Sequence, residues 1–156
     1  MRSFIIFVAT GAYTGYSPIA PGTAGSIPGL ILTWLIFAPL WKYSVILFLI
    51  VFAILFAASC WVAGRAEEIF ERRDDSRIVI DEVLGMTAAM FLLPITWGYL
   101  ALGFFLFRLF DTVKPFPADL IDRRMHGGTG VMLDDLTAAI YANLAVRVLV
   151  LLAHHI

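Results

Sequence analysis

The sequence has few charged residues and almost no net charge. Asp, Glu, Lys and Arg make up 15% of its 156 residues, and the formal net charge is −1 at pH 7. A chain with so little positive charge has no basic surface to attract a phosphate backbone, which excludes a nucleic-acid-binding protein. Its one cysteine, Cys60, also excludes a disulfide framework and a cluster of thiolate metal ligands.

Apolar residues, in contrast, are in excess. The hydrophobic fraction is 61% and the mean hydropathy is +0.90, whereas soluble domains are about 45–50% apolar. A single core of this size cannot bury so much apolar surface. The composition therefore excludes an ordinary soluble globule and a disordered chain. It predicts a small integral membrane protein, with one domain over residues 1–156.

The apolar runs, separated by Gly, Pro and charged residues, predict an all-α membrane bundle of about 4–5 short helices. We expect helices over residues 3–13, 27–40, 45–63 and 136–153, and an irregular loop over the Pro- and Gly-rich residues 17–29. Within the last helix, Arg147 is expected to extend toward the far membrane interface.

The stretch 83–107 is either one tilted span or two short helices that turn near Pro94. Eight of the 11 basic residues lie in 65–77 and 108–124. A single span would place these two groups on opposite sides of the membrane, whereas a hairpin places all eight on one side, as the positive-inside rule prefers. We therefore favour the hairpin.

The charged segment 64–76 is expected to be an amphipathic helical extension at the interface. With the hairpin, the polar loops at 17–26, 65–82 and 108–135 converge on one face of the bundle, which the positive-inside rule predicts to be cytoplasmic. All 12 acidic residues lie between Glu67 and Asp135. The chemistry of the protein is therefore expected at this face.

The first polar cluster is PGTAGS at residues 21–26. Backbone N–H groups at Gly22 and Gly25, hydroxyl groups of Thr23 and Ser26, and the start of a helix together form a suitable anion site. The alternative is a plain turn in which Ser26 caps the helix.

Two acidic pairs form the next clusters, Asp81–Glu82 within residues 78–85 and Asp134–Asp135 at the end of residues 122–135. Unpaired carboxylates at the edge of an apolar helix are costly, so such pairs indicate a metal, a proton pathway or a counter-charge. Ligands that are all oxygen atoms favour a hard ion such as Mg²⁺. The alternative is that they are solvated charges or caps at helix N-termini.

The remaining cluster places Arg108, Asp111 and Lys114 at intervals of three residues. On a helix these side chains share a broad face. Two cations beside a carboxylate are suited to a phosphate group held next to a divalent metal. The alternative is a structural salt bridge, with Lys114 contacting lipid headgroups.

Taken together, four segments resemble the phosphatidylglycerophosphatase A family of bacterial membrane phosphatases. They are PGTAGS at 21–26, IVIDEVLGM at 78–86, FRLFDTVKPFP at 107–117 and DRRMHGGTGVMLDD at 122–135. The resemblance implies Mg²⁺-dependent hydrolysis of phosphatidylglycerophosphate to phosphatidylglycerol and phosphate, in anionic phospholipid synthesis. It also implies a multi-pass protein of the bacterial inner membrane, with its active site facing the cytoplasm.

Under this hypothesis the acidic residues serve as metal ligands and catalytic groups, and the cations and glycines bind the phosphate. The predicted metal ligands are Asp81, Glu82, Asp134 and Asp135, and Asp111 and His126 are further catalytic candidates. The predicted phosphate-binding residues are Gly22, Thr23, Gly25, Ser26, Arg108, Lys114, Gly127 and Gly128.

His126 or a spare carboxylate would protonate the leaving glycerol oxygen. A covalent mechanism that uses Thr23 or an aspartate stays open. The competing functional class is a small membrane cation channel or Mg²⁺ transporter, in which the same carboxylates line a site without hydrolysis. The sequence leaves the oligomeric state open.

Overall fold

The computed structural model describes residues 1–125 and 127–153, and within these ranges the chain is helical, without strands. The element bounds are α1 Arg2–Ala9, a 3₁₀ turn Thr14–Tyr16, α2 Pro21–Leu32, a π-helical segment Thr33–Phe37, α3 Ala38–Tyr43, α4 Val45–Phe70, α5 Ile80–Ala89, α6 Trp97–Val113, α7 Ala118–Arg124 and α8 Gly128–Ala153. The all-α prediction is confirmed. The bundle has more helices than the predicted 4–5 because it also contains the short helices α3 and α7, which the sequence analysis did not expect as separate elements.

Within the described residues, three helical segments are long and apolar enough to cross a membrane. They are Pro21–Tyr43, with 23 residues, and Val45–Phe70 and Gly128–Ala153, with 26 residues each. About 20 residues are enough to cross the hydrocarbon core of a bilayer. The fold therefore agrees with the prediction of an integral membrane protein.

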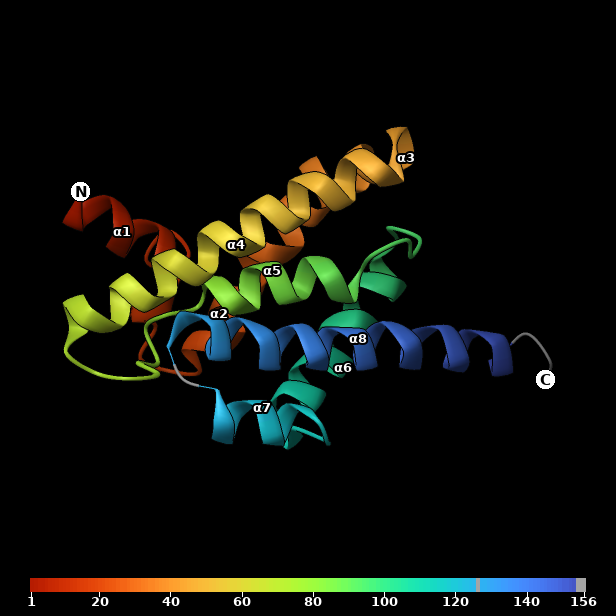
Figure 1. Cartoon of the computed structure of the whole chain (residues 1–156). Coiled ribbons are helices and arrows are strands. Elements are labelled where there is room, and N and C mark those ends of the chain that lie inside the picture. Colours follow the sequence, from red (N-terminus) through yellow and green to blue (C-terminus); the bar gives the residue numbers. More distant parts are fainter. Residues whose placement is uncertain (126, 154–156) are drawn as a thin grey trace.

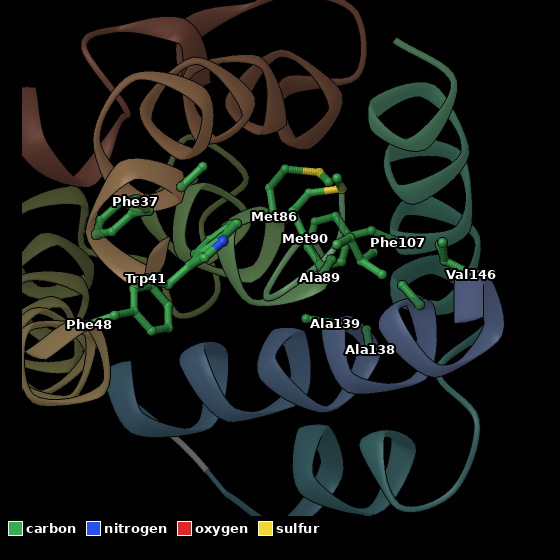
Figure 2. Close-up of a cluster of buried hydrophobic side chains, with 13 residues drawn as sticks. Phe37, Trp41, Phe48, Met86, Ala89, Met90, Phe107, Ala138, Ala139 and Val146 are labelled. Carbon is green, nitrogen blue, oxygen red and sulfur yellow. The ribbon is translucent and has the colours of Figure 1, made fainter. Parts of the chain in front are cut away.

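The short helix α5 lies inside the bundle, packed against α2 and α8 (Figure 1). Its buried Met86 and Met90 meet Phe107 from α6 and small residues of α8 such as Ala139 (Figure 2). With only 10 residues, α5 is about 15 Å long, half of the hydrocarbon thickness. It therefore enters the bundle and ends within it.

Polar side chains of α8 satisfy the main chain at the end of α5. Asn143 donates to the carbonyl oxygens of Ala89 and Phe91, each at 2.9 Å, and Arg147 Nη2 donates to Phe91 O at 3.0 Å. The last carbonyl groups of a helix have no intrahelical partner and need one away from water. Arg147, which is exposed, therefore helps to cap the end of α5, and its extension toward the far interface stays a prediction.

The predicted hairpin within 83–107 is confirmed. Helix α5 ends at Ala89, α6 begins at Trp97, and the chain turns between them around Pro94. The return brings the end of α6 beside the start of α5, where Arg108 lies 3.7 Å from Glu82. A single span over these residues would separate the two side chains by its full length.

The expected irregular loop over 17–29 is wrong, because α2 begins at Pro21 and includes most of these residues. Proline at the first helical position is preorganised for a helix. A Cβ at Gly25 would lie 2.5 Å from Val79 Cβ, and one at Gly29 would lie 2.7 Å from the Val83 carbonyl oxygen. The glycines thus permit close packing of α2 on α5 rather than forming a loop.

Helix boundaries differ from the sequence prediction at two other places. Helix α8 begins at Gly128, eight residues before the predicted start at 136. Gly128 packs directly on the Cys60 carbonyl group of α4, where a Cβ would overlap it. The predicted extension over 64–76 is helical only as far as Phe70, the last residue of α4. The next residue, Glu71, has a left-handed backbone conformation with a φ of 54°, which ends the helix.

Candidate active site

A polar cavity of about 250 Å³ lies where the three predicted polar regions meet. Eight of the predicted site residues line this cavity. They are Gly22, Asp81, Glu82, Arg108, Asp111, Lys114, Asp134 and Asp135. They come from the first turns of α2 and α5, the end of α6 and the second turn of α8. The predicted convergence of these regions is therefore confirmed, while the side of the membrane stays a prediction.

Three carboxylates form the acidic wall of the cavity. Asp81, Glu82 and Asp135 each place one carboxylate oxygen within 4.8 Å of the others. Asp81 and Asp135 are buried, with 7% and 4% of their surface exposed. One oxygen atom of each carboxylate, namely Asp81 Oδ1, Glu82 Oε2 and Asp135 Oδ2, is buried and has no hydrogen-bond partner among the described residues.

This donor set fits a divalent cation. Buried carboxylates that repel each other need a positive partner among them, and three convergent carboxylate oxygens supply the hard ligands that Mg²⁺ prefers. The close packing at Gly85, where a Cβ would lie 3.5 Å from Asp135 Oδ2 and 2.6 Å from the Phe107 ring, keeps α5, α6 and α8 together at this point. The residues present therefore fit the metal that the sequence predicts.

Asp134 takes a different direction from its neighbour. Its Oδ2 atom accepts a 2.5 Å hydrogen bond from Lys114 Nζ, and its Oδ1 atom accepts one of 3.0 Å from the Asp135 N–H. Of the four predicted metal ligands, the structure thus brings three together and pairs the fourth with a lysine. The role of Asp134 as a ligand stays a prediction.

Arg108 forms the basic wall opposite the carboxylates. Its Nη1 atom lies 2.9 Å from Asp111 Oδ2 and 3.7 Å from Glu82 Oε1. The side chain of Arg108 is 21% exposed, so the guanidinium group is held but reachable from the cavity. Its five N–H donors can bind an anion in addition to these two carboxylates.

The start of α2 closes the cavity next to Arg108. A Cβ at Gly22 would overlap Glu82 Oε1 and lie 2.8 Å from Arg108 Nη2. The first hydrogen bond of this turn joins Ala24 N–H to Ala20 O, so the N–H groups of Gly22 and Thr23 precede the intrahelical ladder. The positive end of the helix dipole therefore points toward the cavity.

Other predicted residues lie outside this lining. Ser26 is buried and its hydroxyl group donates to the Gly22 carbonyl, Gly25 packs on Val79, and Gly128 packs on Cys60. Gly127, with a φ of 76°, borders a neighbouring polar pocket. Thr23 is half-buried in the first turn of α2. The predicted His126 lies outside the described residues.

The sequence reasoning placed the loop before α5 at this face but did not name Asp74 and Ser76, which this loop brings to the cavity. Asp75 anchors this loop, because its carboxylate accepts from the Arg77 N–H at 3.0 Å and from Arg77 Nε at 2.7 Å. The hydrogen bond from the Arg77 side chain lowers the pKa of Asp75 below its usual range. Arg77 also lies over the Phe70 ring, 3.9 Å from its centroid. The signal was the acidic pair Asp74–Asp75, which five intervening residues separate from the Asp81–Glu82 pair.

Comparison with known proteins assigns a family to this arrangement. The family model described as Phosphatidylglycerophosphatase A matches residues 7–150. A Haemophilus influenzae protein of that name is 36% identical over 143 residues, which cover 91% of this chain and 86% of the relative. An Escherichia coli protein of the same name is 33% identical, covering 95% of this chain and 83% of the relative. A Bacteroides thetaiotaomicron protein, provisionally named phosphatidylinositol-3-phosphatase, is 33% identical, covering 92% and 91%. No solved structure matches the chain.

Proposed function

Because the chain belongs to the phosphatidylglycerophosphatase A family, we propose that it is a Mg²⁺-dependent lipid phosphatase that converts phosphatidylglycerophosphate into phosphatidylglycerol and phosphate. The enzyme class, a phosphoric monoester hydrolase, follows from the family. The proposed role is the last step of phosphatidylglycerol formation in the bacterial inner membrane.

The observation that carries the proposal is the pairing of an acidic and a basic wall in one cavity. The acidic wall consists of Asp81, Glu82 and Asp135, and Arg108 lies opposite with Lys114 nearby. A phosphate monoester is a dianion that needs cations around its oxygens and a positive group to neutralise charge in the transition state. The opposed walls suit that chemistry better than they suit an uncharged substrate.

Asp81, Glu82 and Asp135 would hold the divalent ion, because their carboxylate groups converge and each has a buried oxygen without a hydrogen-bond partner in the described part of the chain. When bound, Mg²⁺ lowers the pKa of a water molecule and neutralises phosphate oxygens. Arg108 would bind two phosphoryl oxygens through its planar fork of donors. Asp111 holds the guanidinium group in place from 2.9 Å away.

Lys114 and the start of α2 would complete the phosphate site. Asp134 fixes the Lys114 ammonium group at the cavity, where it adds positive charge without the planar geometry of arginine. The N–H groups of Gly22 and Thr23 would donate to the phosphate at the helix N-terminus. Each of these groups stabilises negative charge on the transferring phosphoryl group.

Hydrolysis breaks the bond between phosphorus and the glycerol oxygen, while a water oxygen bonds to phosphorus. The glycerol oxygen then needs a proton. His126 in its protonated form, or Asp111 in its carboxylic acid form, would provide it as the general acid, and a proton from the attacking water would then restore that group. Asp111 lies in the cavity lining beside Arg108, within the region where the leaving group would sit.

The location of the cavity supports a lipid substrate. It lies at one end of the helices and is lined by Arg108 and Lys114, two of the eight basic residues in 65–77 and 108–124. The positive-inside rule places such a face in the cytoplasm, where a lipid headgroup of the inner leaflet would reach the cavity. The active site is therefore proposed to face the cytoplasm.

The test is phosphate release by the purified protein in mixed micelles, with and without a chelator. Phosphatidylglycerophosphate, phosphatidylinositol 3-phosphate and glycerol 3-phosphate are compared at equal concentration. The proposal expects the first lipid to be the best substrate, with activity lost on chelation and restored by Mg²⁺. Faster hydrolysis of the inositol lipid would favour the activity in the name of the Bacteroides relative. Release unaffected by chelation would reject the metal.

A further inference from the structure

An apolar groove of about 530 Å³ lies between α2 and α6. Apart from Thr96, all of its lining residues are apolar. Ile31 and Phe105 within it are 49% and 68% exposed, so the groove is open toward the bilayer. The same two helices border the polar cavity through Gly22 and Arg108.

The wall that α6 contributes continues directly from the phosphate site. Arg108, Phe104, Ala101 and Trp97 follow one another at intervals of four, three and four residues. Side chains at this spacing lie on one face of a helix. Phe104, Ala101 and Trp97 line the groove, and Arg108 lines the polar cavity. One face of α6 therefore joins a cation to an apolar channel.

The wall from α2 runs in parallel. Gly22 borders the polar cavity, and Ile27, Ile31 and Trp34 line the groove further along the same helical segment. Thr23 precedes Ile27 by one helical turn and therefore shares its face. Both walls thus lead away from the phosphate site in the same direction, toward the middle of the membrane.

The length of the groove matches one leaflet of a bilayer. Arg108 lies eleven positions after Trp97, a distance of about 16 Å at the rise of an α-helix. Half of the hydrocarbon core is about 15 Å thick. At the far end the rings of Trp34 and Trp97 approach to 6.4 Å between centroids. The groove therefore extends from the headgroup level to about the bilayer midplane.

We infer that the groove between α2 and α6 binds one acyl chain of the lipid phosphomonoester whose phosphate group occupies the polar cavity. The inference rests on the proposed function and adds a substrate subsite to it. A molecule that carries a phosphate and a long chain on one glycerol fills both parts at once.

Filling the groove tests the inference. Ala101→Trp places a large ring at an exposed position of the lining, and Ala57→Trp on α4 is the matched control, because Ala57 is also exposed and lies outside the groove. The kcat/KM values of a dioleoyl and a dihexanoyl substrate are measured for each variant. The preference of Ala101→Trp for the long-chain substrate should fall at least about 10-fold, the loss expected when two methylene groups lose apolar contact. The control should keep the wild-type preference.

A second measurement does not depend on turnover. A phosphonate analogue with a photoreactive group in its long chain is crosslinked to the wild-type protein, and the adducts are mapped by mass spectrometry. Adducts within 97–105 support the inference. Adducts confined to other helices, an unchanged chain-length preference in Ala101→Trp, or a dimer in light scattering that Ala101→Trp dissociates would each overturn it. Absence of phosphate release by the wild type, with adducts in the groove, would reject the proposed hydrolysis alone.

Discussion

The side-chain amide of Asn143 on α8 donates a 2.9 Å hydrogen bond to the main-chain carbonyl oxygen of Ala89, the last residue of α5. This bond allows a short helix to end inside an apolar bundle. The other end of the same helix carries Asp81 and Glu82 into the polar cavity. The support at one end of α5 and the proposed chemistry at the other are therefore parts of one arrangement.

Asn143→Leu should destabilise the protein by about 1–3 kcal/mol, the cost of leaving a buried carbonyl without a partner. The measurement is the thermal unfolding midpoint in detergent. Leu144→Ala, at a neighbouring exposed position of α8, is the control and should change the midpoint little. An Asn143→Leu midpoint equal to that of the wild type would show that the end of α5 does not need this support.

Arg108→Lys should lower phosphate release at least about 10-fold, equivalent to about 1.4 kcal/mol of transition-state stabilisation. Lysine keeps the charge but loses the planar fork that binds two oxygens. Arg65→Lys is the matched control, because Arg65 pairs with Glu68 on the exposed surface of α4. Turnover close to wild type in a folded Arg108→Lys protein would reduce Arg108 to a structural salt bridge.

Gly22→Ala should lower activity at least about 10-fold, which corresponds to about 1.4 kcal/mol, with little loss of stability. The added Cβ would displace the ends of the Glu82 and Arg108 side chains, which are flexible, rather than the main chain. Gly98→Ala on α6 is the control, since a Cβ there meets no atom within 4 Å. Equal activity of both variants in the phosphate-release assay would argue against the placement of α2 at the phosphate site.

Asp75 should make stability depend on pH in the acidic range. The Arg77 hydrogen bond lowers the pKa of Asp75 in the folded state, so its contribution is complete above the unfolded value of about 4 and is lost as the pH falls through the lower folded value. Thermal unfolding midpoints of the wild type and Asp75→Asn are compared from pH 7 to pH 3. The difference between them should shrink as the pH falls. A constant difference would exclude this ionisation as its cause.

The sequence predicted the features that follow from the cost of burying charge. Carboxylates and cations in an apolar chain must gather, so Asp81, Arg108 and Asp135 were expected in one place, and they line one cavity. The hairpin at Pro94 followed from the distribution of basic residues. These predictions depend on single-residue properties that the sequence states directly.

The sequence could not predict features that depend on a neighbouring helix. Gly22 and Gly25 lie in a helix that packs closely against α5 and the residue before it. This packing cannot be seen in the residues of α2 themselves. Asp134 and Asp135 look equivalent in sequence, but adjacent residues point about 100° apart around a helix. Lys114 therefore pairs with Asp134, while Asp135 lies with the other carboxylates.

The most direct test of the central claim is phosphate release from phosphatidylglycerophosphate by the wild type, Asp81→Asn and Asp135→Asn across a Mg²⁺ titration. Amide replacement keeps the shape of each side chain and removes its charge. The wild type should lose activity on chelation and regain it with Mg²⁺, while each variant should stay below about a tenth of the wild-type rate, a loss above ~1.4 kcal/mol, at every concentration. Both variants keeping more than a tenth of that rate would contradict the metal site and leave these carboxylates as structural charges at the starts of α5 and α8.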